Sequence, residues 1–225
     1  MAEQTRQSWD FGRFFDTLNY FDAIPILSSL QNMFFGSPPP PPPQLQANVV
    51  FDFRQPTEQM RELWGALDDV VMGGVSQSGA QLQSEGLAFT GYVSTANSGG
   101  FASVRTRNFE PPLDLSGYSG IELRVKGDGQ RYKFFLRDGA GWDTVAYAHS
   151  FDTANGDWVN VQIPFAEMKA VQRARVVERA PIDAGRIYSL QLMLSKFEYD
   201  RQLNPHFTAG PFSLVVESVK VYGSP

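Results

Sequence analysis

The stretch Trp64-Gly-Ala-Leu-Asp-Asp-Val-Val-Met-Gly-Gly-Val-Ser-Gln-Ser78 places two adjacent carboxylates, a glycine pair and two serines around a short apolar run. A helix disfavours both the glycine pair and the β-branched Val70 and Val71, and a plain strand would also avoid Gly73 and Gly74. The pattern therefore predicts a strand that enters a tight loop whose backbone is specified by its glycines.

Around this loop, apolar and polar residues alternate in short segments, which is typical of strands. Residues 190–194 have apolar side chains on both faces of a strand, which predicts a central strand that is buried on both faces. Segment 165–180 is the candidate to cover one of these faces. Gly127-Asp-Gly129 lies between two strands and predicts a hairpin. Many short strands separated by turn residues close most readily as an all-β sandwich. The alternating segments are 49–53, 87–89, 121–125, 132–136, 159–163 and 212–216.

The composition narrows the classes of function. Hydrophobic residues make up 42% of the 225 residues, which is enough for a folded core. The net charge of −5 argues against binding to nucleic acid, which relies on many basic residues. The chain has no cysteine, so disulfides, zinc–thiolate sites and thiol catalysis are excluded. Because His149 and His206 are far apart and lack metal-ligand spacing, we expect a binding protein without cofactor, metal or enzymatic activity.

No part of the sequence indicates secretion or insertion into a membrane. The N-terminus lacks a positively charged region followed by an apolar core, and no window approaches the roughly 18 apolar residues of a membrane span. We therefore expect a cytoplasmic protein whose contact with a membrane is peripheral.

Six consecutive prolines, Pro38 to Pro43, divide the chain, because such a run forms a stiff polyproline II rod. We interpret it as a spacer; a ligand for a proline-recognising module and a low-complexity linker without a specific role are the alternatives. The predicted parts are an amphipathic helical docking segment at 1–36, a linker at 37–46 and a β-sandwich domain at 47–225.

Two apolar stripes at helical spacing precede the prolines and predict two amphipathic helices. The second helix begins near Pro25 and ends at Gly36. The stripes must be covered, either by the sandwich and each other or by a partner protein, and we follow the partner interpretation. Acidic residues on the polar face disfavour an anionic membrane. The candidate partner-binding residues are Phe11, Phe14, Phe15, Leu18, Phe21, Leu27, Leu30 and Phe34.

Two glycine-rich loops are candidate recognition sites. Adjacent carboxylates could bind a cation or a sugar hydroxyl if a loop made them converge. Alternatively, one carboxylate satisfies the backbone amides of the glycine turn while the other faces solvent, and the glycines serve only positive φ angles. The candidate residues of these loops are Asp68, Asp69, Gly73, Gly74, Ser76, Asn97, Ser98, Gly99 and Gly100.

Two further groups of residues are candidates for surface contacts. Trp142, Asp143 and Tyr147 could stack and orient a sugar, although tryptophan more commonly packs in a core. A basic cluster in an otherwise acidic chain is either a docking face for an acidic partner or lipid heads, or a solvated face. It consists of Lys169, Arg173, Arg175 and Arg179.

Four motifs in this order resemble those of the complex-I-intermediate-associated protein family. They are the stretch quoted first, Asn97-Ser-Gly-Gly-Phe-Ala-Ser-Val-Arg105, Lys126-Gly-Asp-Gly-Gln-Arg-Tyr132 and Trp158-Val-Asn-Val-Gln-Ile-Pro-Phe165. The resemblance extends from about Val49 to Tyr222. It implies a jelly-roll β-sandwich of the galactose-binding type, and members of the family help to assemble respiratory complex I. Related domains occur in plant and cyanobacterial proteins that support photosystem biogenesis, which makes a cyanobacterial member one interpretation.

Residues and resemblance together lead to one functional expectation. We expect a non-catalytic assembly factor or scaffold that binds subunits or intermediates of a membrane energy-transducing complex. The client would be a photosystem or a complex-I-type NADH dehydrogenase, on the cytoplasmic side of a thylakoid or plasma membrane. A carbohydrate-binding module and an enzyme accessory domain are the alternatives.

Overall fold

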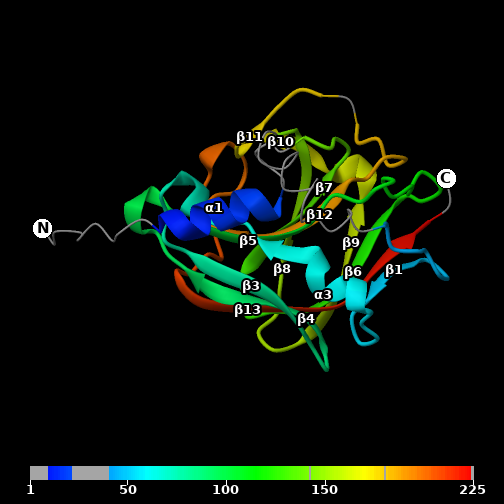
Figure 1. The fold of residues 1–225 in the computed structure, drawn as a ribbon, viewed down its shortest axis with the longest axis horizontal. Helices are drawn as coiled ribbons and strands as arrows, with labels where there is room; N and C mark the ends of the chain where they lie inside the picture. The colour runs from blue at the N-terminus through cyan, green and yellow to red at the C-terminus, as the bar shows by residue number, and fades with distance from the viewer. Residues whose placement is uncertain (1–9, 22–40, 142, 180, 224–225) are drawn as a thin grey trace, which may run out of the picture.

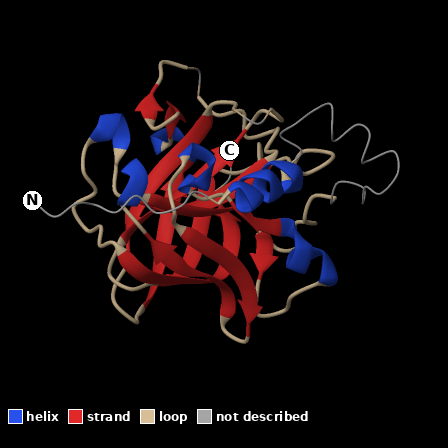
Figure 2. Ribbon diagram, turned by 60° about the vertical axis from the view of Figure 1, so that its left-hand side comes forward, coloured by secondary structure: helices blue, strands red, loops and turns tan. Residues whose placement is uncertain are grey.

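A computed structural model describes residues 10–21, 41–141, 143–179 and 181–223, and its strands form two antiparallel sheets packed face to face (Figure 1). The helical segments lie outside the two layers (Figure 2). The helices and 3-10 turns are α1 (Phe11–Tyr20), α3 (Glu58–Leu63), η1 (Asp69–Met72), η2 (Ala96–Ser98), η3 (Phe165–Glu167) and η4 (Tyr199–Arg201). The strands are β1 (Val49–Asp52), β2 (Trp64–Ala66), β3 (Gln77–Gln83), β4 (Gly86–Val93), β5 (Phe101–Thr106), β6 (Gly120–Lys126), β7 (Arg131–Arg137), β8 (Ala146–Asp152), β9 (Trp158–Pro164), β10 (Lys169–Gln172), β11 (Arg175–Val176), β12 (Ser189–Ser195) and β13 (Gly210–Tyr222).

The six-stranded sheet is organised around its longest strand, β13. Its order is β3-β4-β13-β6-β9, and β1 also pairs with β13. The first half of β13 pairs with β4 and the second half with β1, whereas β6 runs along its other side. Strand β13 therefore joins the N-terminal strand of the sandwich to the rest of this sheet.

The seven-stranded sheet has the order β11-β10-β8-β7-β12-β5-β2. Strand β12 lies between β7 and β5, which confirms the central strand predicted at 190–194. Segment 165–180 does not cover it, however, because β10 and β11 extend the sheet beyond β8. On the outer face, Met193 of β12 packs with a small apolar cluster that includes Phe135 of β7 and Val171 of β10, so Val171 is a residue of that segment that contributes to this face.

The main core fills the space between the two sheets. Phe89 from β4 meets Tyr132 from β7 with ring centroids 6.3 Å apart, and it meets Phe212 from β13 at 4.8 Å. Because Phe89 and Tyr132 belong to different sheets, their edge-to-face contact holds the layers together. All three side chains are almost completely removed from water.

The predicted alternating segments all contain strands, and the all-β sandwich is confirmed. The prediction of a hairpin at Gly127–Gly129 is wrong, because β6 belongs to one sheet and β7 to the other. The turn instead crosses between the layers. Asp128 stabilises this crossing by accepting hydrogen bonds from the Tyr132 hydroxyl at 3.0 Å and the Ser213 amide at 3.0 Å.

The N-terminal segment is described only in part. The first amphipathic helix is confirmed as α1, whereas Leu27, Leu30 and Phe34, with the second predicted helix, lie outside the described residues. None of the helices in the described ranges is long and apolar enough to cross a membrane.

A matched pair of aromatic substitutions tests this core. Phe134→Ala should lower the free energy of unfolding by about 3–5 kcal/mol, because it removes a completely buried ring from β7. Tyr92→Ala removes a ring that is 56% exposed on β4, so its effect should stay within about 0.5 kcal/mol. Urea denaturation of both variants measures the difference, and comparable losses would contradict this assignment of the core.

Candidate functional site

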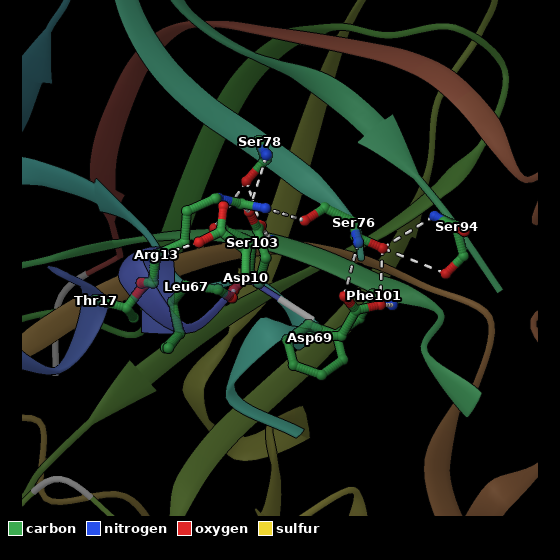
Figure 3. Close-up of polar contacts among 11 residues, drawn as sticks. Asp10, Arg13, Thr17, Leu67, Asp69, Ser76, Ser78, Ser94, Phe101 and Ser103 are labelled. Carbon is green, nitrogen blue, oxygen red and sulfur yellow. Dashed lines mark hydrogen bonds and ion pairs between the residues drawn. The ribbon is translucent and has the colours of Figure 1, made fainter. Parts of the chain in front are cut away.

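The two glycine-rich loops meet at one end of the sandwich, beside α1. The first loop runs from β2 through η1 to β3, and the second runs from β4 through η2 to β5. Figure 3 shows Asp69 together with Arg13 and with serines from both loops and the adjoining strands. Asp68 and Asp69, at the centre of the first loop, are 1% and 0% exposed.

The Asp69 carboxylate joins the two loops. Ser76 donates to it through its amide at 2.9 Å and its hydroxyl at 2.7 Å. From the second loop, the amides of Gly100 and Phe101 donate to Asp69 Oδ2 at 2.7 and 3.3 Å. The Ser76 hydroxyl also accepts a hydrogen bond from the Ser94 amide at 2.9 Å. One buried carboxylate therefore fixes the ends of β4 and β5 relative to β3.

Glycines provide the space for this carboxylate. A Cβ atom on Gly74 would lie 2.3 Å from Asp69 Cγ, and one on Gly99 would lie 2.4 Å from Asp69 Oδ2. Both distances are far shorter than a normal contact. These glycines are therefore required for the close approach of the backbone to Asp69, and not only for turn conformation.

The Asp68 carboxylate joins the two sheets directly. The Ser78 amide on β3 donates to Asp68 Oδ2 at 2.8 Å, and the Ser78 hydroxyl donates to Oδ1. The Ser103 amide on β5 donates to Oδ1 at 3.1 Å. Strand β3 belongs to the six-stranded sheet and β5 to the seven-stranded sheet, so Asp68 bridges their edges.

Helix α1 packs against this end of the sandwich through Arg13. The guanidinium donates to Asp68 Oδ2 at 3.0 Å and to the Ser76 carbonyl at 3.1 Å. At the other end of α1, the Tyr20 hydroxyl donates to the Glu62 carbonyl at 2.6 Å, and the Tyr20 ring lies over Gly65. Of the stripe residues, Phe21 lies against the sandwich, where the Arg105 guanidinium carbon is 5.6 Å from the centre of its ring.

Burial raises the pKa of Asp68 above its ordinary value. The Ser78 hydroxyl, the amides of Ser103 and Ser78, and the charge of Arg13 act in the opposite direction. Arg13 is the cation that Asp68 contacts, and its side chain is 29% exposed.

Neither carboxylate has spare capacity to bind a ligand. A carboxylate offers about four acceptor positions, and each of these two accepts four hydrogen bonds. Within the described ranges, no group of three or more His, Cys, Asp or Glu side chains could hold a metal ion. The arrangement therefore favours a structural role for Asp68 and Asp69 over cation or sugar binding. The expectation that one of the two carboxylates faces solvent is wrong, because both are buried.

Part of the apolar stripe on α1 faces solvent. Phe11 is 57% exposed and Phe15 is 43% exposed, whereas Phe14 and Leu18 are half-buried. The rings of Phe11 and Phe15 lie 5.4 Å apart. Met72 of η1, which lies against α1, is 68% exposed. We call Phe11, Phe15 and Met72 the α1 apolar patch.

Comparisons with known proteins identify the family of this chain. A sequence profile described as "Complex I intermediate-associated protein 30 (CIA30)" matches residues 51–216. The chain belongs to the CIA30 family. An uncharacterized protein of Schizosaccharomyces pombe is 31% identical over 186 residues, which cover 75% of this chain and 81% of that protein.

Two solved structures resemble the CIA30 sandwich. One is a family 11 carbohydrate-binding module from Clostridium thermocellum in complex with a mixed-linked tetrasaccharide, with 18% identity, a TM-score of 0.55, and coverage of 79% of this chain and 95% of that one. The other is a family 11 module of the cellulosomal cellulase Lic26A-Cel5E of the same organism, with 16% identity, a TM-score of 0.56, and coverage of 80% and 96%. At these identities the likeness shows the jelly-roll fold alone.

The two candidate sugar contacts that the structure describes, Asp143 and Tyr147, do not form an exposed platform. Tyr147 is 2% exposed in the main core, so its ring presents no face to a sugar. Asp143 accepts hydrogen bonds from Arg173, and Trp142 lies outside the described residues.

The basic cluster gathers at the β10–β11 end of the seven-stranded sheet. Lys169, Arg173, Arg175 and Arg179 are all exposed. The Lys169 ammonium lies 4.4 Å from the centre of the Tyr199 ring, and Arg173 pairs with Asp143. A role for this cluster in binding a partner stays a prediction.

Sequence reasoning missed Arg13 and Ser103 as partners of Asp68. Arg13 lies 55 residues before Asp68, and Ser103 lies 35 residues after it. The spacing of Asp69 and Ser76 was the one local signal, because a loop of this length can bring a hydroxyl back to a carboxylate. Asn97 contributes as well, since its amide donates to the Gly73 carbonyl at 3.3 Å.

Substitutions at two glycines test whether a glycine is needed for the close approach of the backbone to Asp69 or only for backbone flexibility. Gly74→Ala should lower the free energy of unfolding by about 2 kcal/mol or more, because the methyl group collides with the buried carboxylate. Gly79→Ala on β3 is the control, since nothing lies within 4 Å of its Cβ position. Equal stability of the Gly74 and Gly79 variants would refute the close approach.

Asp69→Asn should lower the free energy of unfolding by about 1–3 kcal/mol, because an amide group cannot accept hydrogen bonds from all four donors.

Removal of Arg13 should have a pH-dependent effect. The pKa of Asp68 is raised in the folded protein, so the carboxyl group lowers the free energy of unfolding as the pH rises and the group becomes charged. The positive charge of Arg13 offsets part of this loss of stability. Arg13→Met should therefore lower stability by about 2 kcal/mol near pH 7 and by less near pH 4.

Thermal unfolding of this variant across that pH range provides the measurement. Arg54→Met is the control, since Arg54 is 52% exposed and pairs with the surface residue Asp52. A loss for Arg13→Met that does not change with pH would show that Arg13 acts through packing alone.

Proposed function

We propose that this protein is a non-catalytic assembly factor that binds subunits or intermediates of a complex-I-type NADH dehydrogenase. Its membership of the CIA30 family supports this proposal, because the description of the family refers to intermediates of complex I. Neither the family description nor the relatives reported above name a photosystem, so we favour the NADH dehydrogenase as the client. Contact with the membrane, on its cytoplasmic side, would then be made through that client.

The observation that carries the proposal is the α1 apolar patch. Exposed aromatic and methionine side chains on one face are typical of protein docking sites, where aromatic anchors dominate the binding energy. The patch is held on the sandwich by Arg13, Asp68 and Tyr20. Less conformational entropy is therefore lost on binding than with a freely tethered helix.

The Asp68–Asp69 site supports a role without catalysis. All acceptor positions of both carboxylates are occupied, so neither has a free oxygen for acid–base chemistry. In this proposal, the two aspartates position α1 and the loops, and α1 contacts the client. The carbohydrate-binding modules share the fold, but no arrangement of described residues favours a sugar site.

The proposal predicts that the exposed rings of α1 dominate client binding. Phe11→Ser combined with Phe15→Ser should weaken binding about thirtyfold, because loss of an aromatic anchor typically costs about 2 kcal/mol or more. Tyr92→Ser combined with Leu203→Ser is the control, since these residues are 56% and 74% exposed on other elements. Comigration with the large complex on native gels of detergent-solubilised membranes measures binding.

The melting temperature of each double variant shows whether folding is intact. If the Phe11/Phe15 variant folds normally and still comigrates at the wild-type level, α1 is not the client contact. The basic cluster at β10 and β11 would then be the next surface to test.

A further inference from the structure

Strand β9 forms one edge of the six-stranded sheet and pairs on one side only, with β6. The pairing covers all seven residues of β9 in one continuous register without a bulge. Of the described elements, β6 alone packs extensively along β9. Asn160 and Gln162 are exposed, and Val159 and Val161 are partly exposed, so the other side of this strand is open to solvent.

The backbone groups on the open side of β9 are available for hydrogen bonds. The Phe165 amide donates to the Ser119 carbonyl at 3.0 Å, directly beyond the last residue pair of β9 and β6. Because hydrogen-bonded pairs alternate along an antiparallel ladder, Val161 bonds to β6, whereas Asn160 and Gln162 direct their N–H and C=O groups away from it. Among the described residues, none outside this ladder forms a backbone hydrogen bond with Asn160 or Gln162.

The side chains of β9 do not protect this edge. Edge strands are commonly protected by charged residues, prolines, bulges or a covering segment. Strand β9 contains no charged residue, and its one proline, Pro164, is its last residue. The cations that contact β9 belong to β6, where Arg124 and Lys126 lie 5.6 and 5.1 Å from the centre of the Trp158 ring. No charge on β9 itself therefore keeps another strand away.

The other three sheet edges differ from β9. At β3, the Ser78 amide donates to the buried Asp68, which interrupts that edge. Strand β2 has three residues and contacts α1 and α3. Strand β11 has two residues, one of which is Arg175. In the described sheets, β9 is therefore the longest uninterrupted open edge.

The sequence of β9 is suited to pairing with an identical strand. On the inner side, Val159 and Val161 pack against the main core but stay partly exposed at its rim. Two antiparallel copies centred on Asn160 place Val159 against Val161 on this side, and neutral amides against each other on the outer side. A two-fold axis brings identical residues close together, so a strand without charges avoids the repulsion that a charged strand would produce.

We propose that β9 pairs with β9 of a second copy of this chain, in an antiparallel arrangement that joins the two six-stranded sheets. One strand pair buries less surface than a permanent interface, so the dimer forms at high micromolar concentration and not at nanomolar concentration. A strand of another protein is the alternative occupant, and the uncharged, self-complementary pattern favours the second copy. The proposal is independent of the assembly role and of the α1 apolar patch.

Sedimentation equilibrium of the full chain, from micromolar to near-millimolar concentration, tests this proposal. The wild-type protein should change from monomer to dimer over this range. Gln162→Pro removes an N–H group that points away from β6, so it should weaken the dimer about tenfold or more, because the two-fold axis removes the donor twice. Gln162→Thr keeps the N–H group and is the matched control, and its dimer should be unchanged.

A second pair of substitutions identifies the edge. Asn160→Lys places like charges near each other across the two-fold axis and should weaken the dimer about tenfold. Gln81→Lys adds the same charge at an exposed position of β3 and should leave the dimer unchanged. The melting temperature of each variant shows whether it is folded, and Asn160→Lys decides the question where Gln162→Pro does not fold.

The proposal is overturned if the chain stays monomeric at near-millimolar concentration, or if folded Gln162→Pro and Asn160→Lys dimerise like the wild type. Equal losses in Gln162→Thr and Gln162→Pro would also overturn it, because the side chain and not the backbone would then make the contact. A dimer that is lost in Gln81→Lys alone would assign the interface to β3 and overturn the proposal as well.

Discussion

The structure depends on two adjacent carboxylates that are buried at the junction of its two sheets. Asp68 and Asp69 are almost inaccessible to water, so their charges must be compensated inside the protein. Seven of the eight hydrogen bonds to these carboxylates come from β3 in one sheet, from β5 in the other, and from the residues directly before these strands. Asp68 has an extended backbone and Asp69 begins η1, and each carboxylate reaches a separate set of donors. The pair thereby fixes how the edges of the two sheets meet.

The position of α1 is a consequence of this junction. Backbone amides and hydroxyls supply three of the four hydrogen bonds to Asp68, and none of these donors carries a full charge. Arg13 supplies the fourth hydrogen bond together with a positive charge. A helix whose apolar stripe is only partly covered is therefore held at one place and in one orientation. The exposed side chains of Phe11 and Phe15 become a defined surface and not part of a loose tail.

The likeness to carbohydrate-binding modules illustrates how little a jelly-roll fold says about function. The frame of strands is shared at 16–18% identity. In this chain, however, Tyr147 of β8 is buried in the core, and Asp143 is engaged by Arg173. Recognition depends on side chains that the frame presents, and these differ between the proteins. The α1 apolar patch and the open edge of β9 are features of this chain's own residues.

The sequence by itself determined the strands, because the alternation of apolar and polar residues depends only on residues that are close along the chain. The alternating segments 49–53, 121–125 and 212–216 all contain strands in the structure. It also indicated the loop at Gly73 and Gly74 and the helix at Phe11. The partners of Asp68, the sheet to which β6 and β7 each belong, and the surface that α1 covers were decided only by the tertiary structure. These features join residues that are distant along the chain, and the burial that makes Asp68 require a cation exists only once both sheets have packed.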